Sequence, residues 1–377
     1  MVGIVSLAVS AVLWAGWGEV PPALGAPRAP QAMGWIDRGA RTIPELAARL
    51  APQQVLLVEV SAVWCAPCHQ LANEILDTPA AAAIVAGDVG VRVDFDSDYG
   101  QLVKRMYGVL QVPALLVIDH EGREIGRVEG YAQAADWTEA VRDARAGGAG
   151  LAALAARQQA APEDLELGIA VAQAQLVRGD EATALAALDA IIARSDVAPG
   201  PAAHAARVKG RWLLRVREDA PRGRAHFEAM MVRFAGRPDD WRQFLYWAAA
   251  ACHAQKDDAG ALALFASWRK SQPRGQPANG PDGPARTFAL EPEALAPLED
   301  QADFMVFHTF AASESEPVVR ELLLRAPDGA NGYYLLAQVL RQKRDLAGAR
   351  AAIARAVALE PGAAMYANYQ RRLGGAR

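Results

Sequence analysis

Two cysteines separated by two residues, Cys65 and Cys68, are the residues of this chain whose types and spacing could do chemistry most directly. They follow an apolar run typical of a strand, residues 55–60, and open a segment, 65–76, with the pattern of a helix. Both thiols would then lie on one helical turn, close enough to form a disulfide. Cys65 would be at the helix start, where unpaired N–H groups and the helix dipole lower a thiol pKa to about 3.5–7.5. This predicts that Cys65 attacks a substrate disulfide and Cys68 resolves the mixed disulfide.

Two other interpretations of the pair stay open, which are half of a metal site and an inert structural disulfide. A four-thiolate zinc site needs a second Cys-x-x-Cys pair, and the chain has none. The remaining cysteine, Cys252, has alanines at 249 and 250 beside it and is predicted to be buried and inert. His69, directly after the pair, is predicted to be a solvated helix position, with tuning of the resolving cysteine as the alternative. No Gly-rich phosphate loop or zinc-protease helix stands out, so we predict neither a cofactor nor a metal site.

The elements that must position the dithiol follow from periodicity between about residues 42 and 146. Short β-rich runs alternate there with helical segments, which is the pattern of an α/β unit. A turn at His120–Gly122 indicates that the last two strands form a hairpin. The expected strands are 55–60, 91–95, 114–118 and 124–129, and the expected helices are 65–76, 98–107 and 136–145.

After Gly147 and Gly148 the strand patterns end and alanine dominates, which predicts an all-helical region over residues 148–377. Small and large residues recur there at offsets that resemble the tetratricopeptide repeat, in which small residues let paired helices approach closely. A Pro/Gly-rich stretch, 273–284, is expected to be a loop inserted into the array. The positions that carry the repeat pattern are Tyr333, Leu336, Ala337, Leu340, Ala349, Ile353 and Ala356, with further copies at Leu245, Ala249, Ala261, Phe265 and Trp268.

Residues 42–146 resemble the thioredoxin superfamily in three separated features. These are Val58-Glu59-Val60 before the motif, Trp64-Cys65-Ala66-Pro67-Cys68 itself, and Val112-Pro113 before a strand. Within the superfamily, residues 71–98 look most like the C-terminal domain of the periplasmic reductase DsbD and its relatives. The resemblance implies a thioredoxin-like α/β domain over 34–147, with a central mixed sheet flanked by helices. An all-α solenoid of the tetratricopeptide type would follow over 148–377.

The resemblance also implies roles for further residues. Pro113 would be a cis-proline facing the dithiol, leaving the Val112 backbone free to pair with a substrate strand. Glu59 would be a buried acid beneath the resolving cysteine, able to accept the Cys68 proton. Trp64 would shield the sulfurs and contact partners. Pro67 between the cysteines is typical of thioredoxin-type reductants and favours a reductase or electron relay.

The N-terminus carries no charge over Met1–Gly18, and the stretch from 21 to 32 is rich in Pro and Ala. We predict a signal peptide or membrane anchor plus linker over 1–33, and hence a periplasmic or otherwise exported protein. The alternative is a buried first helix or strand. The chain is 52% hydrophobic with a net charge of −4, which excludes a largely disordered chain and argues against general nucleic-acid binding.

Two classes of function fit these patterns. In the first, an exported thiol–disulfide oxidoreductase receives electrons from a thiol donor and reduces a disulfide-containing client protein held by the repeats. In the second, the repeats and apolar surface bind unfolded proteins, as in thioredoxin–tetratricopeptide holdase chaperones, and the dithiol is secondary. A scaffold with a vestigial site is a third interpretation. The intact Cys65–Cys68 pair and the apolar N-terminus favour the first.

Overall fold

The computed structural model describes residues 35–36, 38–79, 81, 87–148, 150–271 and 292–375. The predicted N-terminal signal or anchor, 1–33, and the predicted inserted loop, 273–284, therefore lie outside the described residues. Across the ranges just given, no helix combines the length and apolar character needed to cross a membrane.

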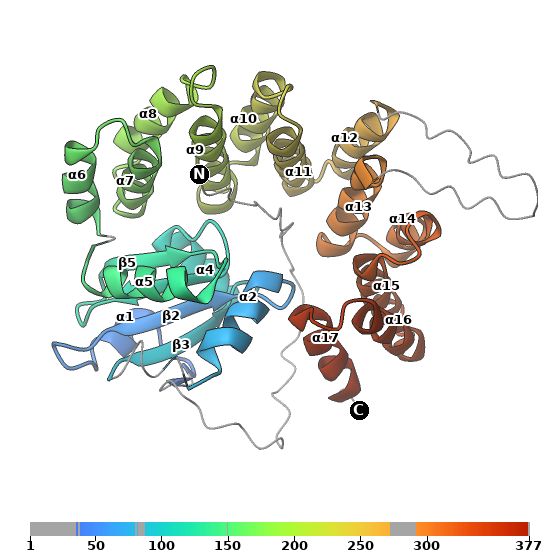
Figure 1. The fold of residues 1–377 in the computed structure, drawn as a ribbon, viewed down its shortest axis with the longest axis horizontal. Helices are drawn as coiled ribbons and strands as arrows, with labels where there is room; N and C mark the ends of the chain where they lie inside the picture. The colour runs from blue at the N-terminus through green and yellow to red at the C-terminus, as the bar shows by residue number, and fades with distance from the viewer. Residues whose placement is uncertain are drawn as a thin grey trace, which may run out of the picture. The chain divides into compact units, whose positions relative to one another are not determined.

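One mixed sheet forms the centre of the N-terminal part (Figure 1). Its strand order is β1-β3-β2-β4-β5, with β1 and β2 parallel to β3, and with β4 antiparallel to both β2 and β5. The four predicted strands are confirmed to within two residues at each end, and the β4–β5 hairpin is present. The strands are β1 Trp35–Ile36, β2 Leu56–Ser61, β3 Val89–Asp94, β4 Ala114–Ile118 and β5 Glu124–Glu129.

Helices flank this sheet, and one face of it packs against the helix that follows the cysteines. Leu57 and Leu115 of the sheet share a buried cluster with Leu71 and Ile75 of that helix and with Trp137 of α5. The predicted helix over 65–76 is present, but its second half widens into a π-helical turn, η1. The helices are α1 Ile43–Ala47, α2 Ala66–Leu71, η1 Ala72–Leu76, α4 Asp98–Tyr107 and α5 Ala134–Arg145.

The rest of the described chain is helical, and helices that are neighbours in sequence pack on one another through much of it (Figure 1). Contacts group the described residues up to Asp240, including the sheet, into one compact unit, and those from Trp241 into a second. The helices are α6 Leu151–Ala160, α7 Leu165–Val177, α8 Glu181–Ile192, α9 Pro199–Arg211, η2 Trp212–Val216, α10 Ala220–Arg233, α11 Pro238–Ala254, α12 Asp258–Ser271, α13 Pro292–Phe307, α14 Ala312–Arg325, α15 Ala330–Gln342, α16 Leu346–Leu359 and α17 Ala364–Gly375.

The small residues of the predicted repeat are buried where the helices meet. Ala349, Ile353 and Ala356 of α16 are fully buried, and α16 packs along α15. Ala261 and Phe265 of α12 are buried in the same way. Alanine at such positions allows close approach of helices, so the pattern correctly predicted a helical array. The predicted fold class, an α/β domain followed by an all-helical region, is confirmed.

Candidate functional site

Cys65 and Cys68 form a disulfide at the start of α2, with the sulfur atoms 2.07 Å apart. Cys65 is the N-cap residue of this helix, and its Sγ accepts a hydrogen bond from the Cys68 backbone N–H at 3.1 Å. The first N–H groups of a helix have no partner within the helix, so a sulfur placed there receives their partial positive charge. The same N–H is in position to stabilise a thiolate on Cys65 once the disulfide is reduced.

The dithiol is enclosed in this oxidised form. Cys65 has no exposed surface, and Cys68 and Trp64 are also buried. The Trp64 indole Nε1 donates to Asp96 Oδ2 at 2.7 Å, and its ring meets Phe95 edge-on with centroids 6.3 Å apart. The segment after β3 therefore fixes the residue that precedes Cys65. The contact of Trp64 with partner proteins stays a prediction.

The Val112–Pro113 peptide bond is cis, as the resemblance implied. Pro113 leads directly into β4, whose first residue, Ala114, pairs with Val60 near the end of β2. Because β2 and β4 are antiparallel, the start of β4 and the end of β2 lie at the same edge of the sheet. Since β2 leads on to Cys65, this topology brings the proline segment and the dithiol to one edge. The roles of Val112 and Pro113 toward a client strand stay predictions.

Glu59 is buried in β2, with 2% of its surface exposed, and is paired with a cation. Its Oε2 accepts from Arg92 Nε at 2.6 Å, and Arg92 Nη2 donates to Asp77 Oδ1 at 2.7 Å. Burial raises the pKa of Glu59, and the charge of Arg92 opposes that shift. Glu59 is on the same face of β2 as Leu57, which packs against the helix carrying Cys68. Its role as the acceptor of the Cys68 proton stays a prediction.

Arg92 also belongs to the site, although no sequence motif indicated it. Arg92 is opposite Glu59 in the parallel β2–β3 register, and its guanidinium also lies 4.3 Å from the centroid of the Trp35 ring. The signal was a charged residue between two valines in β3, Val91-Arg92-Val93, which puts the arginine on one face of the sheet. Only the strand register shows that the face is the one shared with Glu59.

Pro67 and His69 lie in the first turns of α2. Pro67 is at a position where the missing N–H costs no helical hydrogen bond. The prediction that His69 is a solvated position is wrong, because its Nε2 lies 2.8 Å from the Val63 carbonyl oxygen and the residue is half-buried. With a carbonyl as partner, Nε2 carries the proton and donates. His69 thus ties the helix to the loop in front of Cys65.

Comparison with known proteins agrees with this geometry. Residues 46–145 match the family model for a thioredoxin-like domain, and no curated protein shows significant similarity to the chain. The match covers the sheet from β2 to β5, the cysteine pair and the cis-proline. The chain therefore contains a thioredoxin-like domain over about a quarter of its length, followed by an all-helical region. In the described ranges, no three His, Cys, Asp or Glu side chains are grouped so that they could hold a metal ion.

Proposed function

We propose that the protein is a thiol–disulfide oxidoreductase that acts as a reductase or electron relay on disulfides of an exported client protein. The observation that carries this proposal is the position of Cys65, which caps α2, accepts an N–H on its sulfur and has Cys68 one turn away. A thioredoxin-like domain with an intact dithiol is the setting in which such a thiol does redox chemistry.

The proposed reaction proceeds in two exchanges. The Cys65 thiolate attacks one sulfur of the client disulfide, a mixed disulfide forms, and the first client sulfur leaves as a thiolate. Cys68 then gives up its proton, for which Glu59 is the proposed acceptor, and attacks the Cys65 sulfur. The second client sulfur leaves, and the Cys65–Cys68 disulfide forms. Two electrons have passed to the client, and a dithiol donor restores the reduced pair.

Pro67 favours electron flow from the dithiol to the client, because proline between the two cysteines is typical of thioredoxin-type reductants. We therefore expect equilibration with glutathione or dithiothreitol buffers to give a reduction potential at or below about −230 mV, on the thioredoxin side of the range. The oxidised fraction is measured by mass spectrometry after alkylation. A potential near about −120 mV, typical of a strong oxidant, would overturn the reductase proposal.

A holdase function is the second candidate, and apolar residues exposed on the helical region favour it. Val197, Val232 and Leu324 expose 78%, 81% and 75% of their surface. If the protein is a holdase, the wild-type full chain and the Cys65→Ser variant should suppress aggregation of an unfolded client equally well. Loss of insulin reduction in Cys65→Ser, with no suppression of aggregation by either protein, would favour the reductase and exclude the holdase.

A further inference from the structure

A buried arginine of the helical region reaches the thioredoxin-like domain beside its dithiol site. Arg215 lies in η2 and has 8% of its surface exposed. Its Nη1 donates to the Leu110 carbonyl oxygen at 2.6 Å. Its guanidinium carbon also lies 5.3 Å from the centroid of the Phe95 ring. A charged donor at this distance from a carbonyl makes a strong hydrogen bond, and burial shields it from competing water.

The Leu110 carbonyl and the Phe95 ring, which Arg215 contacts, both connect to the proposed site. Leu110 is buried and is three residues before the cis-proline Pro113. Phe95 packs edge-on against Trp64, which directly precedes Cys65. One guanidinium therefore contacts the segment that carries Val112 and the ring that supports the residue before the reactive cysteine.

The contact of Arg215 with Leu110 is part of a wider interface between η2, with the residues next to it, and residues 105–111. Gly108 ends α4 in the left-handed conformation, with φ +56°, and a Cβ there would lie 2.9 Å from Trp212 Cζ3. Arg211 Nη1 donates to Gln111 Oε1 at 3.2 Å, so a second arginine holds the residue next to Val112.

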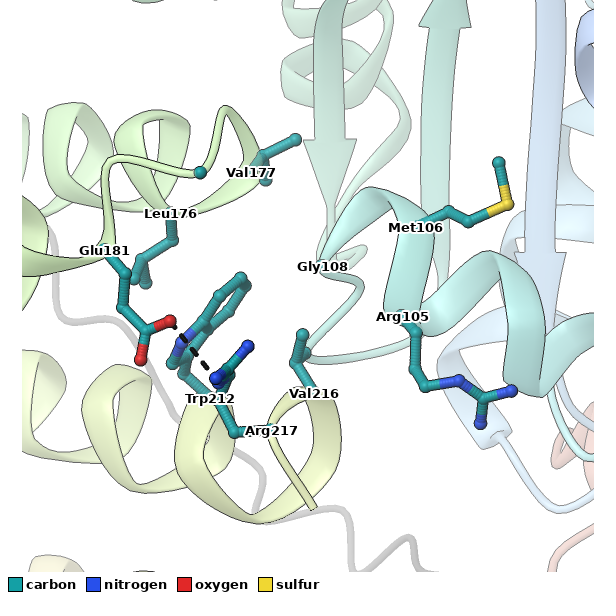
Figure 2. Close-up of a pocket in the computed structure, with 10 residues that line it drawn as sticks. Arg105, Met106, Gly108, Leu176, Val177, Glu181, Trp212, Val216 and Arg217 are labelled. Carbon is teal, nitrogen blue, oxygen red and sulfur yellow. Dashed lines mark ion pairs between the residues drawn. The ribbon is translucent and has the colours of Figure 1, made fainter. Parts of the chain in front are cut away.

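An exposed ion pair and a small pocket also belong to this interface. Arg105 of α4 pairs with Glu218 at 3.1 Å. A pocket of about 410 Å³ lies here, and Arg105 and Met106 of α4 are among the residues that line it. Figure 2 shows Trp212 with Leu176 and Val177 of α7 among its other lining residues. The helical region is thus in direct contact with the segment that approaches the cis-proline.

We propose that Arg215 is a positioning residue of the dithiol site, which fixes the Leu110 carbonyl and thereby the segment through which Val112 pairs with a client strand. This inference rests on the proposed function. It assigns to the first helices a part in building the site, in addition to the client recruitment expected from the sequence. Arg215 is proposed to act through the Leu110 carbonyl and to take no part in the exchange chemistry, so its loss should weaken client binding far more than it slows that chemistry.

The test compares Arg215→Met with the matched control Arg217→Met in the full chain. Arg217 is two residues further on, is exposed and pairs with Glu181 at 3.4 Å. For Arg215→Met we expect KM for insulin to rise about tenfold with kcat within about twofold, the equivalent of one lost hydrogen bond. Arg217→Met should match the wild type in both constants. Arg215→Lys keeps the charge without the planar fork and should fall between them.

Hydrogen exchange gives a readout that needs no enzymatic activity. Peptides covering residues 109–113 should exchange about tenfold faster in Arg215→Met, while those from β4 and α5 stay unchanged. The inference would be overturned if folded Arg215→Met showed unchanged exchange at residues 109–113. If Arg215→Met does not fold, the same measurement on Arg215→Lys decides. A loss in kcat equal to the loss in kcat/KM would also overturn the inference. Faster exchange there in a protein that reduces no disulfide would retain the positioning role and reject the proposed function.

Discussion

The substitution Cys65→Ser is expected to lower the rate of insulin reduction by about a thousandfold or more, with no change in helical content. A serine hydroxyl occupies nearly the same volume but does not ionise at neutral pH and cannot form a disulfide, so the first exchange is lost entirely. The measurement is insulin turbidity with dithiothreitol as electron donor, together with far-ultraviolet circular dichroism.

Two companion variants make this result specific. Cys252 is fully buried and lies outside the Cys65–Cys68 disulfide, so Cys252→Ala controls for the removal of a cysteine as such and should retain activity. Cys68→Ser should accumulate a mixed disulfide between Cys65 and the client, because the resolving thiol is missing. Activity that survives Cys65→Ser, or that is lost in Cys252→Ala, would contradict the assignment of the attacking sulfur.

The second large effect is expected from Arg92→Met, which removes the cation from a buried carboxylate. Glu59 Oε2 would lose the 2.6 Å contact that compensates its burial. Breaking a buried pair by removing one partner costs about 3–5 kcal/mol, and the partial exposure of Arg92 favours the lower end of this range. We therefore expect urea denaturation at pH 8 to show a loss of about 3 kcal/mol in the free energy of unfolding.

The loss should depend on pH, and its sign follows from the Glu59 pKa. Burial raises that pKa above 4.5 in the folded protein, and removing Arg92 raises it further. The folded state then keeps a proton that the unfolded state has released, so stability falls as pH rises from about 4.5 through the folded pKa. The difference between wild type and Arg92→Met should therefore be smaller at pH 5 than at pH 8.

Glu59→Gln in the Arg92→Met background is the control for this prediction. It removes the charge that Arg92 compensates, so the double variant should regain stability at pH 8 and lose the dependence on pH. An equal deficit at pH 5 and pH 8, or no recovery in the double variant, would show that Arg92 acts through packing on Trp35 instead of through charge.

The elements around the dithiol were predictable because their signals are local. β4 begins and ends where its apolar run does, and α4 lies between the cap residue Ser97 and Gly108, which adopts the left-handed conformation. The cysteine spacing likewise predicted that both thiols lie in the first turn of a helix. These signals depend on neighbours within a few residues, whereas the cis-proline at Val112-Pro113 was implied by the resemblance to the thioredoxin superfamily.

What could not be predicted depends on register or on distant contacts. β1 has two residues, too few for any periodicity. The pairing of Glu59 with Arg92 follows only from the strand register. The bond from Arg215 to the Leu110 carbonyl joins residues 105 positions apart, so no local pattern indicates it. The contribution of η2 to the site therefore required the structure.

The most direct test of the proposed function is the pH dependence of Cys65 alkylation in the reduced full-length protein, because the function requires a lowered pKa of the Cys65 thiol. Trapping with iodoacetamide at a series of pH values, followed by mass spectrometry of the Cys65 peptide, gives the thiol pKa from the midpoint of the rate profile. The pH midpoint is the quantity to compare, because Cys65 is buried in the oxidised form and the absolute alkylation rate also depends on how easily the reagent reaches the sulfur. We predict a midpoint below about 7.5, and a midpoint near about 8.5, the value of a free thiol, would contradict the account.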